Sequence, residues 1–239
     1  MSQISGTLGR IAAITRFPVK SMAGERLEEA EFDWQGLEGD RQYAFVKRGD
    51  RSRFPWLTGR DVSAMVLCRA RYADPAAPRT AAVTVSTPAG DWPFDHPALS
   101  DWLEEQFGRP IDLIQLGIGA YDAMPVSVLT TATLAALERK HGSPLDPRRF
   151  RANIVVESDA REGNWAGHRL RLGGEENAAE LQMAGLAPRC AMVTIDPDTA
   201  VRDAGVLRTV AQAFDNRVAC YASIARPGLA RIGDEVLLT

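Results

Sequence analysis

The most informative chemistry-bearing segment of this chain is a run of cations followed by an apolar stretch. It reads Pro147-Arg148-Arg149-Phe150-Arg151-Ala152-Asn153. Successive side chains of an extended chain point to opposite faces, so an extended run over 147–156 predicts Arg149, Arg151 and Asn153 on one face. Guanidinium groups bind phosphate through two parallel hydrogen bonds, and an amide both donates and accepts. The run therefore predicts a phosphate-binding face, with a solvated and charged sheet edge as the alternative.

A cysteine beside an arginine is the second candidate, in Ala187-Pro188-Arg189-Cys190. The arginine stabilises a thiolate, which is the form that ligates metals or acts as a nucleophile. The alternative is a small buried apolar residue, and we adopt that interpretation for Cys68 and Cys220, which lie in apolar runs. Three cysteines cannot hold a conventional iron–sulfur cluster, and the three histidines lack zinc-ligand spacing.

Two turns and one helix start present further polar groups. Phe17-Pro18-Val19-Lys20-Ser21 ends a strand at a proline and then presents a cation and a hydroxyl, while Gly39-Asp40-Arg41 presents a second cation. Thr130 stands where a helix begins, so it is an N-cap whose neighbouring amides could also help to hold an anion. A surface salt bridge or a simple cap explains each of these segments equally well when it is taken alone.

Composition and missing motifs exclude several classes of protein. The net charge of −3 argues against a surface devoted to nucleic acid, and 45% hydrophobic residues are ordinary for a globular chain. There is no nucleophile elbow and no phosphate loop, and Leu116-Gly117-Ile118-Gly119-Ala120 lacks the third glycine and the frame of a dinucleotide turn. No stretch approaches the roughly 18–20 apolar residues that span a bilayer, and no signal peptide is visible. We expect a cytoplasmic protein that binds neither membrane nor nucleic acid.

The elements that position these residues do not alternate as strand and helix, which disfavours a doubly wound sheet. Short apolar or alternating segments bounded by turns predict strands over 8–17, 27–32, 43–46, 83–86, 91–94, 151–156, 169–172, 191–195 and 235–238. Helical spacing and capping residues predict helices ending at 107, running from 130 or 131 to 142, and spanning 206–214. The fold class is therefore α+β and β-rich, with a few peripheral helices and a boundary that divides the chain into 1–120 and 121–239.

Taken in order, several motifs resemble the MOSC family (molybdenum cofactor sulfurase C-terminal domain) with its N-terminal β-barrel companion. The resemblance is closest to the amidoxime-reducing components and their bacterial counterparts, and it runs through most of the chain. It rests on the segments at 17–21, 37–41, 57–60, 149–156, 189–190, 196–199 and 228–236. Two departures are Ala152, where relatives usually have proline, and Ala200, where they usually have glycine. The resemblance implies a MOSC-type β-barrel preceded by a β-rich domain. As a third departure, we expect neither the membrane anchor nor the ferredoxin-like domain of some relatives.

The same resemblance implies a pterin-based molybdenum cofactor whose metal takes the Cys190 thiolate as its protein ligand. No pyridoxal phosphate site is expected. The residues that would bind the pterin and its phosphate are Lys20, Ser21, Arg41, Thr130, Arg149, Arg151, Asn153 and Arg189. The implied activity is reduction of N-hydroxylated or N-oxide-type small molecules. Because the chain shows no iron–sulfur, flavin or nicotinamide site, electrons would come from a separate ferredoxin-, flavoprotein- or cytochrome-type donor. The alternatives are a sulfur carrier that uses a Cys190 persulfide and a non-catalytic cofactor-binding protein.

Overall fold

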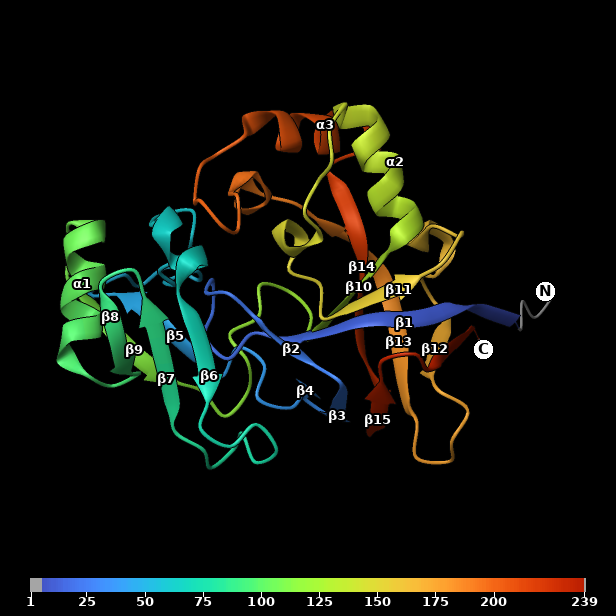
Figure 1. Ribbon diagram of the computed structural model, residues 1–239, viewed down its shortest axis with the longest axis horizontal. Coiled ribbons are helices and arrows are strands. Elements are labelled where there is room, and N and C mark those ends of the chain that lie inside the picture. Colours follow the sequence, from blue (N-terminus) through green and yellow to red (C-terminus); the bar gives the residue numbers. More distant parts are fainter. Residues whose placement is uncertain (1–5, 239) are drawn as a thin grey trace.

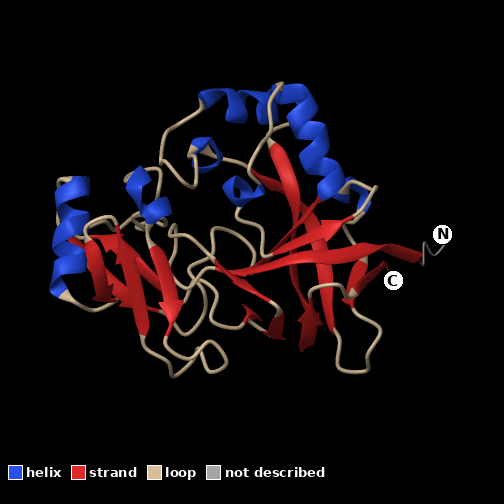
Figure 2. Ribbon diagram, in the orientation of Figure 1, coloured by secondary structure: helices blue, strands red, loops and turns tan. Residues whose placement is uncertain are grey.

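The computed structural model describes residues 6–238, and three hydrophobic cores organise them. One core fills a β-barrel, a second lies among the strands and helix of residues 43–115, and a third lies beneath two helices that pack on the barrel. Figures 1 and 2 show the barrel on the right, the smaller β-rich unit on the left and the two helices above the barrel.

Seven strands close into the barrel, and their neighbours follow the order β11-β10-β14-β13-β12-β16-β1. The pairing of β1 with β11 completes the ring, so no edge is left within it. Only the pairing of β10 with β11 is parallel among these barrel strands. The strands are β1 (Gly6–Arg16), β10 (Val126–Thr130), β11 (Ile154–Glu157), β12 (Arg169–Leu172), β13 (Ala179–Pro188), β14 (Arg217–Arg226) and β16 (Glu235–Leu238).

The first barrel strand comes from the opposite end of the chain to the other six. In β1, Ile11 and Ile14 are fully buried in the barrel core, whereas Ala13 is half-buried on its outer face. A short strand outside the ring, β2 (Glu25–Leu27), pairs antiparallel with the last residues of β1. Across the predicted boundary at 120/121, β1 therefore hydrogen-bonds to strands of the second segment.

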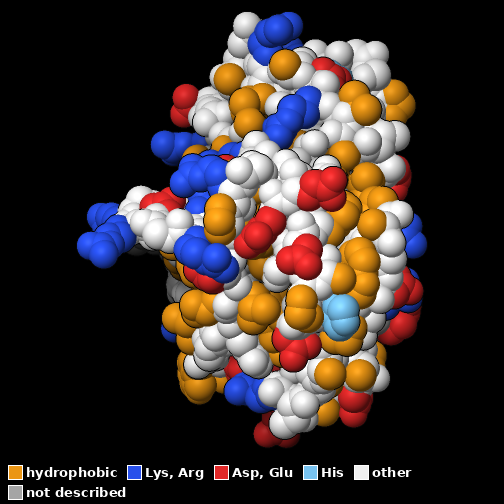
Figure 3. Space-filling model, turned by 90° about the vertical axis from the view of Figure 1, so that its left-hand side faces the viewer, with side chains coloured by type: hydrophobic (Ala, Val, Ile, Leu, Met, Phe, Trp, Pro, Cys, Tyr) orange, Lys and Arg blue, Asp and Glu red, His pale blue; other side chains and the backbone are white. Residues whose placement is uncertain are grey.

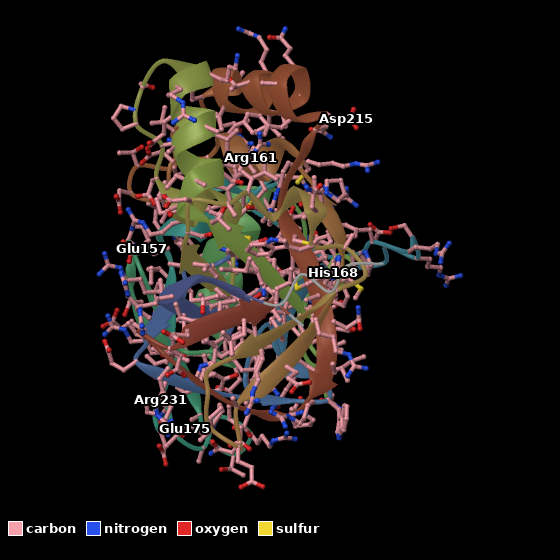
Figure 4. The ribbon with its side chains drawn as sticks, turned by 90° about the vertical axis from the view of Figure 1, so that its right-hand side faces the viewer. Glu157, Arg161, His168, Glu175, Asp215 and Arg231 are labelled. Atoms are coloured by element: carbon pink, nitrogen blue, oxygen red, sulfur yellow. The ribbon has the colours of Figure 1, made fainter. Side chains whose placement is uncertain are left out.

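Three small sheets complete the strand structure. One pairs β15 (Gly228–Arg231) with β3 (Glu29–Asp33) and β4 (Gly36–Leu37), and it contributes Phe32 to the barrel core. Figure 4 shows Arg231 on β15 beside Glu175 in the loop between β12 and β13, and an ion pair of 3.0 Å joins them. The other two sheets are formed by β5 (Tyr43–Lys47) with β9 (Ile111–Gln115) and by β6 (Arg69–Tyr72), β7 (Val83–Thr87) and β8 (Gly90–Pro93).

Helices are few and peripheral, and strands predominate, which confirms the predicted fold class of a β-rich α+β protein with peripheral helices. Figure 3 shows Lys and Arg side chains crowding one flank of the face that α1 belongs to, so the small net charge is unevenly spread. No helix among the described residues is long and apolar enough to cross a membrane. The helices are α1 (Pro97–Phe107), α2 (Thr131–His141) and α3 (Ala204–Phe214), with 3₁₀ turns η1 (Ser63–Leu67), η2 (Pro147–Phe150), η3 (Glu162–Asn164) and η4 (Ala191–Thr194).

One predicted strand begins later than expected and another is wrong, and both lie close to candidate site residues. The strand expected over 151–156 begins only at Ile154, because Asp146 caps a 3₁₀ turn whose first residue is Pro147. The strand expected over 191–195 is instead η4, since a short apolar run does not distinguish strand from helix. The three predicted helices are present, each ending close to its predicted limit.

Candidate functional site

A cavity of about 110 Å³ opens between the loop after β1, the η2 segment and the loop after β13. All the predicted site residues except Thr130 line it: Lys20, Ser21, Arg41, Arg149, Arg151, Asn153, Arg189 and Cys190. The lining residues that the sequence did not assign to the site are Thr58, Arg60, Tyr121, Asp122, Met124, Ser127, Phe150, Pro188, Met192, Val193 and Tyr221.

Lys20 is held at the cavity by the turn that follows β1. Its backbone N–H donates to the carbonyl of Tyr43 at 2.8 Å, and the turn brings Ser21 into the left-handed region at φ 67°. The Lys20 ammonium donates to the carbonyl of Ala120 at 2.6 Å and pairs with Asp122 at 2.5 Å. Burial lowers the pKa of Lys20 from its ordinary value, while Asp122 opposes this shift. The turn thus presents a buried cation to the cavity.

Arg41 and Arg151 stack on the ring of Phe17. Their guanidinium carbons lie 4.7 Å and 4.2 Å from the ring centroid, a distance typical of a cation–π contact. Asp40 pairs with Arg41 and also accepts the backbone N–H of Phe17 at 2.7 Å, so one buried carboxylate fixes both the ring and the first arginine. The two cations are held near each other by the fold itself, and this arrangement favours an anion between or beside them.

The η2 segment brings Arg149, Arg151 and Asn153 to the cavity by a route other than the predicted strand. Arg149 lies in the 3₁₀ turn and Arg151 is left-handed at φ 50°, so strand alternation does not set their directions. Arg149 pairs with Asp196 at 2.7 Å, and Arg151 donates to the carbonyl of Met22 at 2.7 Å. Burial, with a smaller effect from Arg41, lowers the pKa of Arg151 to about 9, which leaves it cationic at neutral pH.

Asn153 is occupied by the barrel itself. Its Oδ1 accepts the backbone N–H of Ser127 at 3.2 Å, and its Nδ2 donates to the carbonyl of Thr15 at 3.3 Å. Arg41 also donates to the Oδ1 of Asn153, at 3.4 Å. The amide therefore ties β1 and β10 to the arginine cluster, and it acts on the cavity mainly by positioning.

Arg189 and Cys190 close the opposite side of the cavity. Arg189 donates to the carbonyls of Val218 at 2.8 Å and Phe150 at 3.0 Å, and its pKa is lowered by burial. Cys190 is exposed, whereas Cys68 and Cys220 are buried. Burial raises the pKa of Cys68 to about 12 and that of Cys220 to about 11, so both remain thiols. Cys190 is thus the accessible thiol, beside a cation.

Thr130, which the sequence assigned to the site, is not among the residues that line this cavity. It is fully buried as the N-cap of α2, where its Oγ1 accepts the backbone N–H of Thr133 at 3.1 Å. The same hydroxyl donates to Glu162 at 2.7 Å, and Glu162 also accepts from the Thr133 hydroxyl at 2.7 Å. The Thr130 hydroxyl is therefore used within the chain, as the cap of α2 and as a donor to Glu162.

Some lining residues had a sequence signal and others had none. Thr58 and Arg60 fall in the segment 57–60 that carried the family resemblance, and they could have been assigned from it. Asp122 and Tyr221 lie in unremarkable surroundings, and only the folded chain brings Asp122 to Lys20 and Tyr221 to the cavity.

The cavity fits a multiply charged anion beside a soft metal. Buried nitrogens of three lining arginines find no hydrogen-bond partner within residues 6–238: Arg149 Nε, Arg151 Nη2 and Arg189 Nη2. Unpartnered buried donors are costly, so a bound phosphate that accepts from them stabilises the site. The described residues contain no group of three or more His, Cys, Asp or Glu side chains that could hold a metal alone. A metal here would need to arrive with most of its ligands, as it does in a cofactor.

The comparisons with known proteins agree with this geometry. Residues 115–237 match the MOSC domain family, and residues 8–110 match the family of MOSC N-terminal β-barrel domains. The chain belongs to the MOSC family. The cavity lies where the two matched regions meet, because Lys20 and Arg41 come from the first and Arg151 and Cys190 from the second.

Individual relatives of this MOSC protein are distant. It is 37% identical to the mitochondrial amidoxime reducing component 2 of Bos taurus over 84 residues, which are 34% of this chain and 23% of that protein. The match thus spans about a quarter of the relative's length. Among solved structures, the YuaD protein of Bacillus subtilis superimposes with a TM-score of 0.53 at 15% identity, covering 98% of each chain. At that identity the likeness shows the fold alone.

Proposed function

We propose that this MOSC protein holds a pterin-based molybdenum cofactor and reduces N-hydroxylated or N-oxide-type compounds with electrons from a separate donor. The donor is of the ferredoxin, flavoprotein or cytochrome class, and the proposed location is the cytoplasm. Membership of the MOSC family and the similarity to an amidoxime reducing component support a function associated with the molybdenum cofactor.

One observation carries the proposal: an exposed cysteine borders a cavity whose arginines have buried, unpartnered nitrogens. A soft thiolate suits a metal already bound by sulfur, and guanidinium groups suit a phosphate. Arg149, Arg151 and Arg189 would bind the phosphate end of the cofactor, and Cys190 would ligate its metal. The cofactor, when bound, supplies two-electron redox chemistry.

The overall reaction balances without any further oxidant or reductant. The N–O bond of the substrate breaks, the donor is oxidised by two electrons, and two protons enter, so that the reduced nitrogen compound and water leave. The protein's residues bind and orient the cofactor. Cys190 is exposed at the cavity, so a substrate arriving from solvent could reach the group that this thiolate would hold.

A sulfur carrier with a Cys190 persulfide is the second candidate, and the exposure of Cys190 favours it because a persulfide must reach its acceptor. The arginine cluster argues against this candidate, since sulfur transfer requires no phosphate site. A non-catalytic cofactor-binding protein would use the same residues and differ only in lacking turnover.

The test begins with protein produced in a host that makes the molybdenum cofactor. We expect stoichiometric molybdenum and released pterin, and reduction of a benzamidoxime-type substrate with reduced viologen but not with NADH alone. Cofactor without turnover supports the storage alternative, and a persulfide without pterin supports the sulfur carrier. Robust turnover with NADH alone would reveal a cofactor site that this proposal lacks.

A further inference from the structure

A second and larger cavity, of about 580 Å³, lies on the other side of the arginine wall. It is bounded by the outer face of the barrel at β1, β2 and β11, by β6, and by the η2 and η4 segments. A bridge between Ala23 and Arg69 joins the β2 side to β6, which Figure 1 shows running past the end of β1. Cavities of this size are typical of small-molecule sites. Cys190 does not line it.

The floor of this second cavity is apolar where a barrel exterior is usually polar. Ala13 and Val155 are paired across β1 and β11 and are both half-buried on the outer face. Phe17 and Val66 are buried beside them. Binding of a ligand with an apolar body to this floor is favourable, because it removes apolar surface of both from water.

The rim of the second cavity is cationic. The side chains of Arg69 and Arg71 are exposed on β6 and make no hydrogen bond or close ion pair with any residue in 6–238, although the charge of Arg69 helps to lower the pKa of Asp198. Within the described residues, the Arg26 side chain donates only to the carbonyl of Ala12, at 2.9 Å. Glu25 is the one lining carboxylate among the described residues, and Arg16 occupies it at 2.7 Å. The rim is therefore complementary to a negative group.

We propose that the second cavity binds an organic anion, a carboxylate, sulfonate or phosphate ester with an aromatic or branched apolar body. The apolar part lies on Ala13 and Val155, and the charged group faces Arg69 and Arg71. Arg149, Arg151 and Met192 line both cavities, so the two sites are neighbours. This inference does not depend on the proposed reaction, because it concerns a different cavity.

The test uses 8-anilinonaphthalene-1-sulfonate as the probe, with its fluorescence measured against the full, cofactor-free chain. We expect one saturable site per chain and weaker binding of the uncharged N-phenyl-1-naphthylamine. The double variant Arg69→Glu/Arg71→Glu should weaken sulfonate binding by about tenfold or more, equivalent to about 1.4 kcal/mol. The matched control Arg51→Glu/Arg53→Glu, at exposed arginines outside both cavities, should change it less than about twofold.

A second variant tests the floor without changing any charge. Ala13→Trp places a large ring in the cavity, and it should abolish the saturable site while far-UV circular dichroism stays unchanged. If Ala13→Trp fails to fold, the double variant Arg69→Glu/Arg71→Glu still tests the proposal, because it changes only exposed side chains. Absence of saturable binding to the wild type, equal affinity of the uncharged amine, or equal affinity of the double variant overturns the proposal. Loss of binding in Arg189→Ala, which lines only the first cavity, also overturns it, because the probe would then occupy the first cavity.

Discussion

Arg148 and Arg151 lie three residues apart in one segment, and the fold treats them in opposite ways. Arg148 is exposed and pairs with both Asp146 and Asp198, each at 2.5 Å. These carboxylates raise its pKa above the ordinary value. Arg151 faces the cavity with a buried, unpartnered Nη2, and burial lowers its pKa to about 9. Arg148 is thus paired with carboxylates of its own chain, whereas Arg151 keeps a hydrogen-bond donor that a ligand could pair with.

This contrast separates structural cations from binding cations better than the sequence does. A run of arginines is usually a solvated face, and Arg148 is an example of it. A buried guanidinium that lacks an acceptor costs stability unless a ligand supplies one. Among the arginines of the first cavity, Arg41 and Arg149 have carboxylate partners, whereas Arg151 and Arg189 pair with no carboxylate in residues 6–238. An anionic ligand would supply the charge partner that these two arginines lack.

The largest expected effect is at the thiol of the cavity. Cys190→Ser should retain pterin, which the arginines bind, and should lose activity by on the order of a hundredfold or more, since changes even in the groups that support a metal ligand typically cost about 10–100-fold. Viologen-driven turnover and pterin content report the two effects separately. Cys68→Ala, at a buried cysteine, is the control. Full activity in Cys190→Ser would remove the ligand assignment.

The next effect compares the two arginines directly. Arg151→Ala should weaken cofactor retention by about 2–5 kcal/mol, the usual cost of removing one partner of a buried charge pair. Arg148→Ala should leave retention unchanged. Pterin content after dialysis measures both. If Arg151→Ala kept the wild-type content, the distinction between the two arginines would have no functional meaning.

A third prediction concerns the cofactor-free protein. Arg151→Met should be neutral or should raise its free energy of unfolding at pH 7 by about 1–4 kcal/mol, as when other buried charges are replaced by apolar groups. A base whose pKa is lower in the folded state than in the unfolded state destabilises the folded protein while it is protonated. This cost is relieved as the pH rises above about 9, where the folded arginine loses its proton before the unfolded one does. The difference between variant and wild type should therefore shrink above pH 9. Urea unfolding at pH 7 and pH 10 measures it, and a difference that grew with pH would contradict the burial argument.

The smallest effect is expected on the surface. Arg148→Ala should lower the free energy of unfolding by about 0–1 kcal/mol, because its side chain is 55% exposed and water replaces the lost ion pairs. The same urea titration measures this change, with Asp198→Ala as the partner variant. A loss above about 2 kcal/mol would show that this surface network is stronger than exposed pairs normally are.

Most residues that line the first cavity and bear charge could be predicted from the sequence, although the predicted strand geometry of 149–153 is wrong. Arg149, Arg151 and Asn153 were placed together by strand alternation, yet a 3₁₀ turn and a left-handed residue bring them to the cavity. The signal for that turn was present, since Asp146-Pro147 is a typical helix start. The pairing of Lys20 with Asp122 joins residues 102 positions apart, and no local pattern encodes it.

The β-rich class followed from short apolar segments and turns, but the closure of the barrel did not. Strands β13 and β14 are long and carry small residues such as Ala187, Ala219 and Ala222, which weaken a strand pattern. Strand β1 belongs to a barrel whose other strands come from residues 126–238. Its pairings join residues far apart in sequence, and the hydrophobic periodicity of a single segment cannot show them.

The position of β1 has a consequence for how the molecule folds. Gly6 pairs with Leu238, so the last contact of the ring joins nearly opposite ends of the described chain. Pairings of such long sequence separation form late, because closing a long loop costs entropy before any contact compensates it. Until residues 235–238 leave the ribosome, β1 and β12 each keep an open edge towards the missing strand. Nascent chains of this protein should therefore be prone to strand-mediated aggregation until residues 235–238 have been made and can pair with both edges.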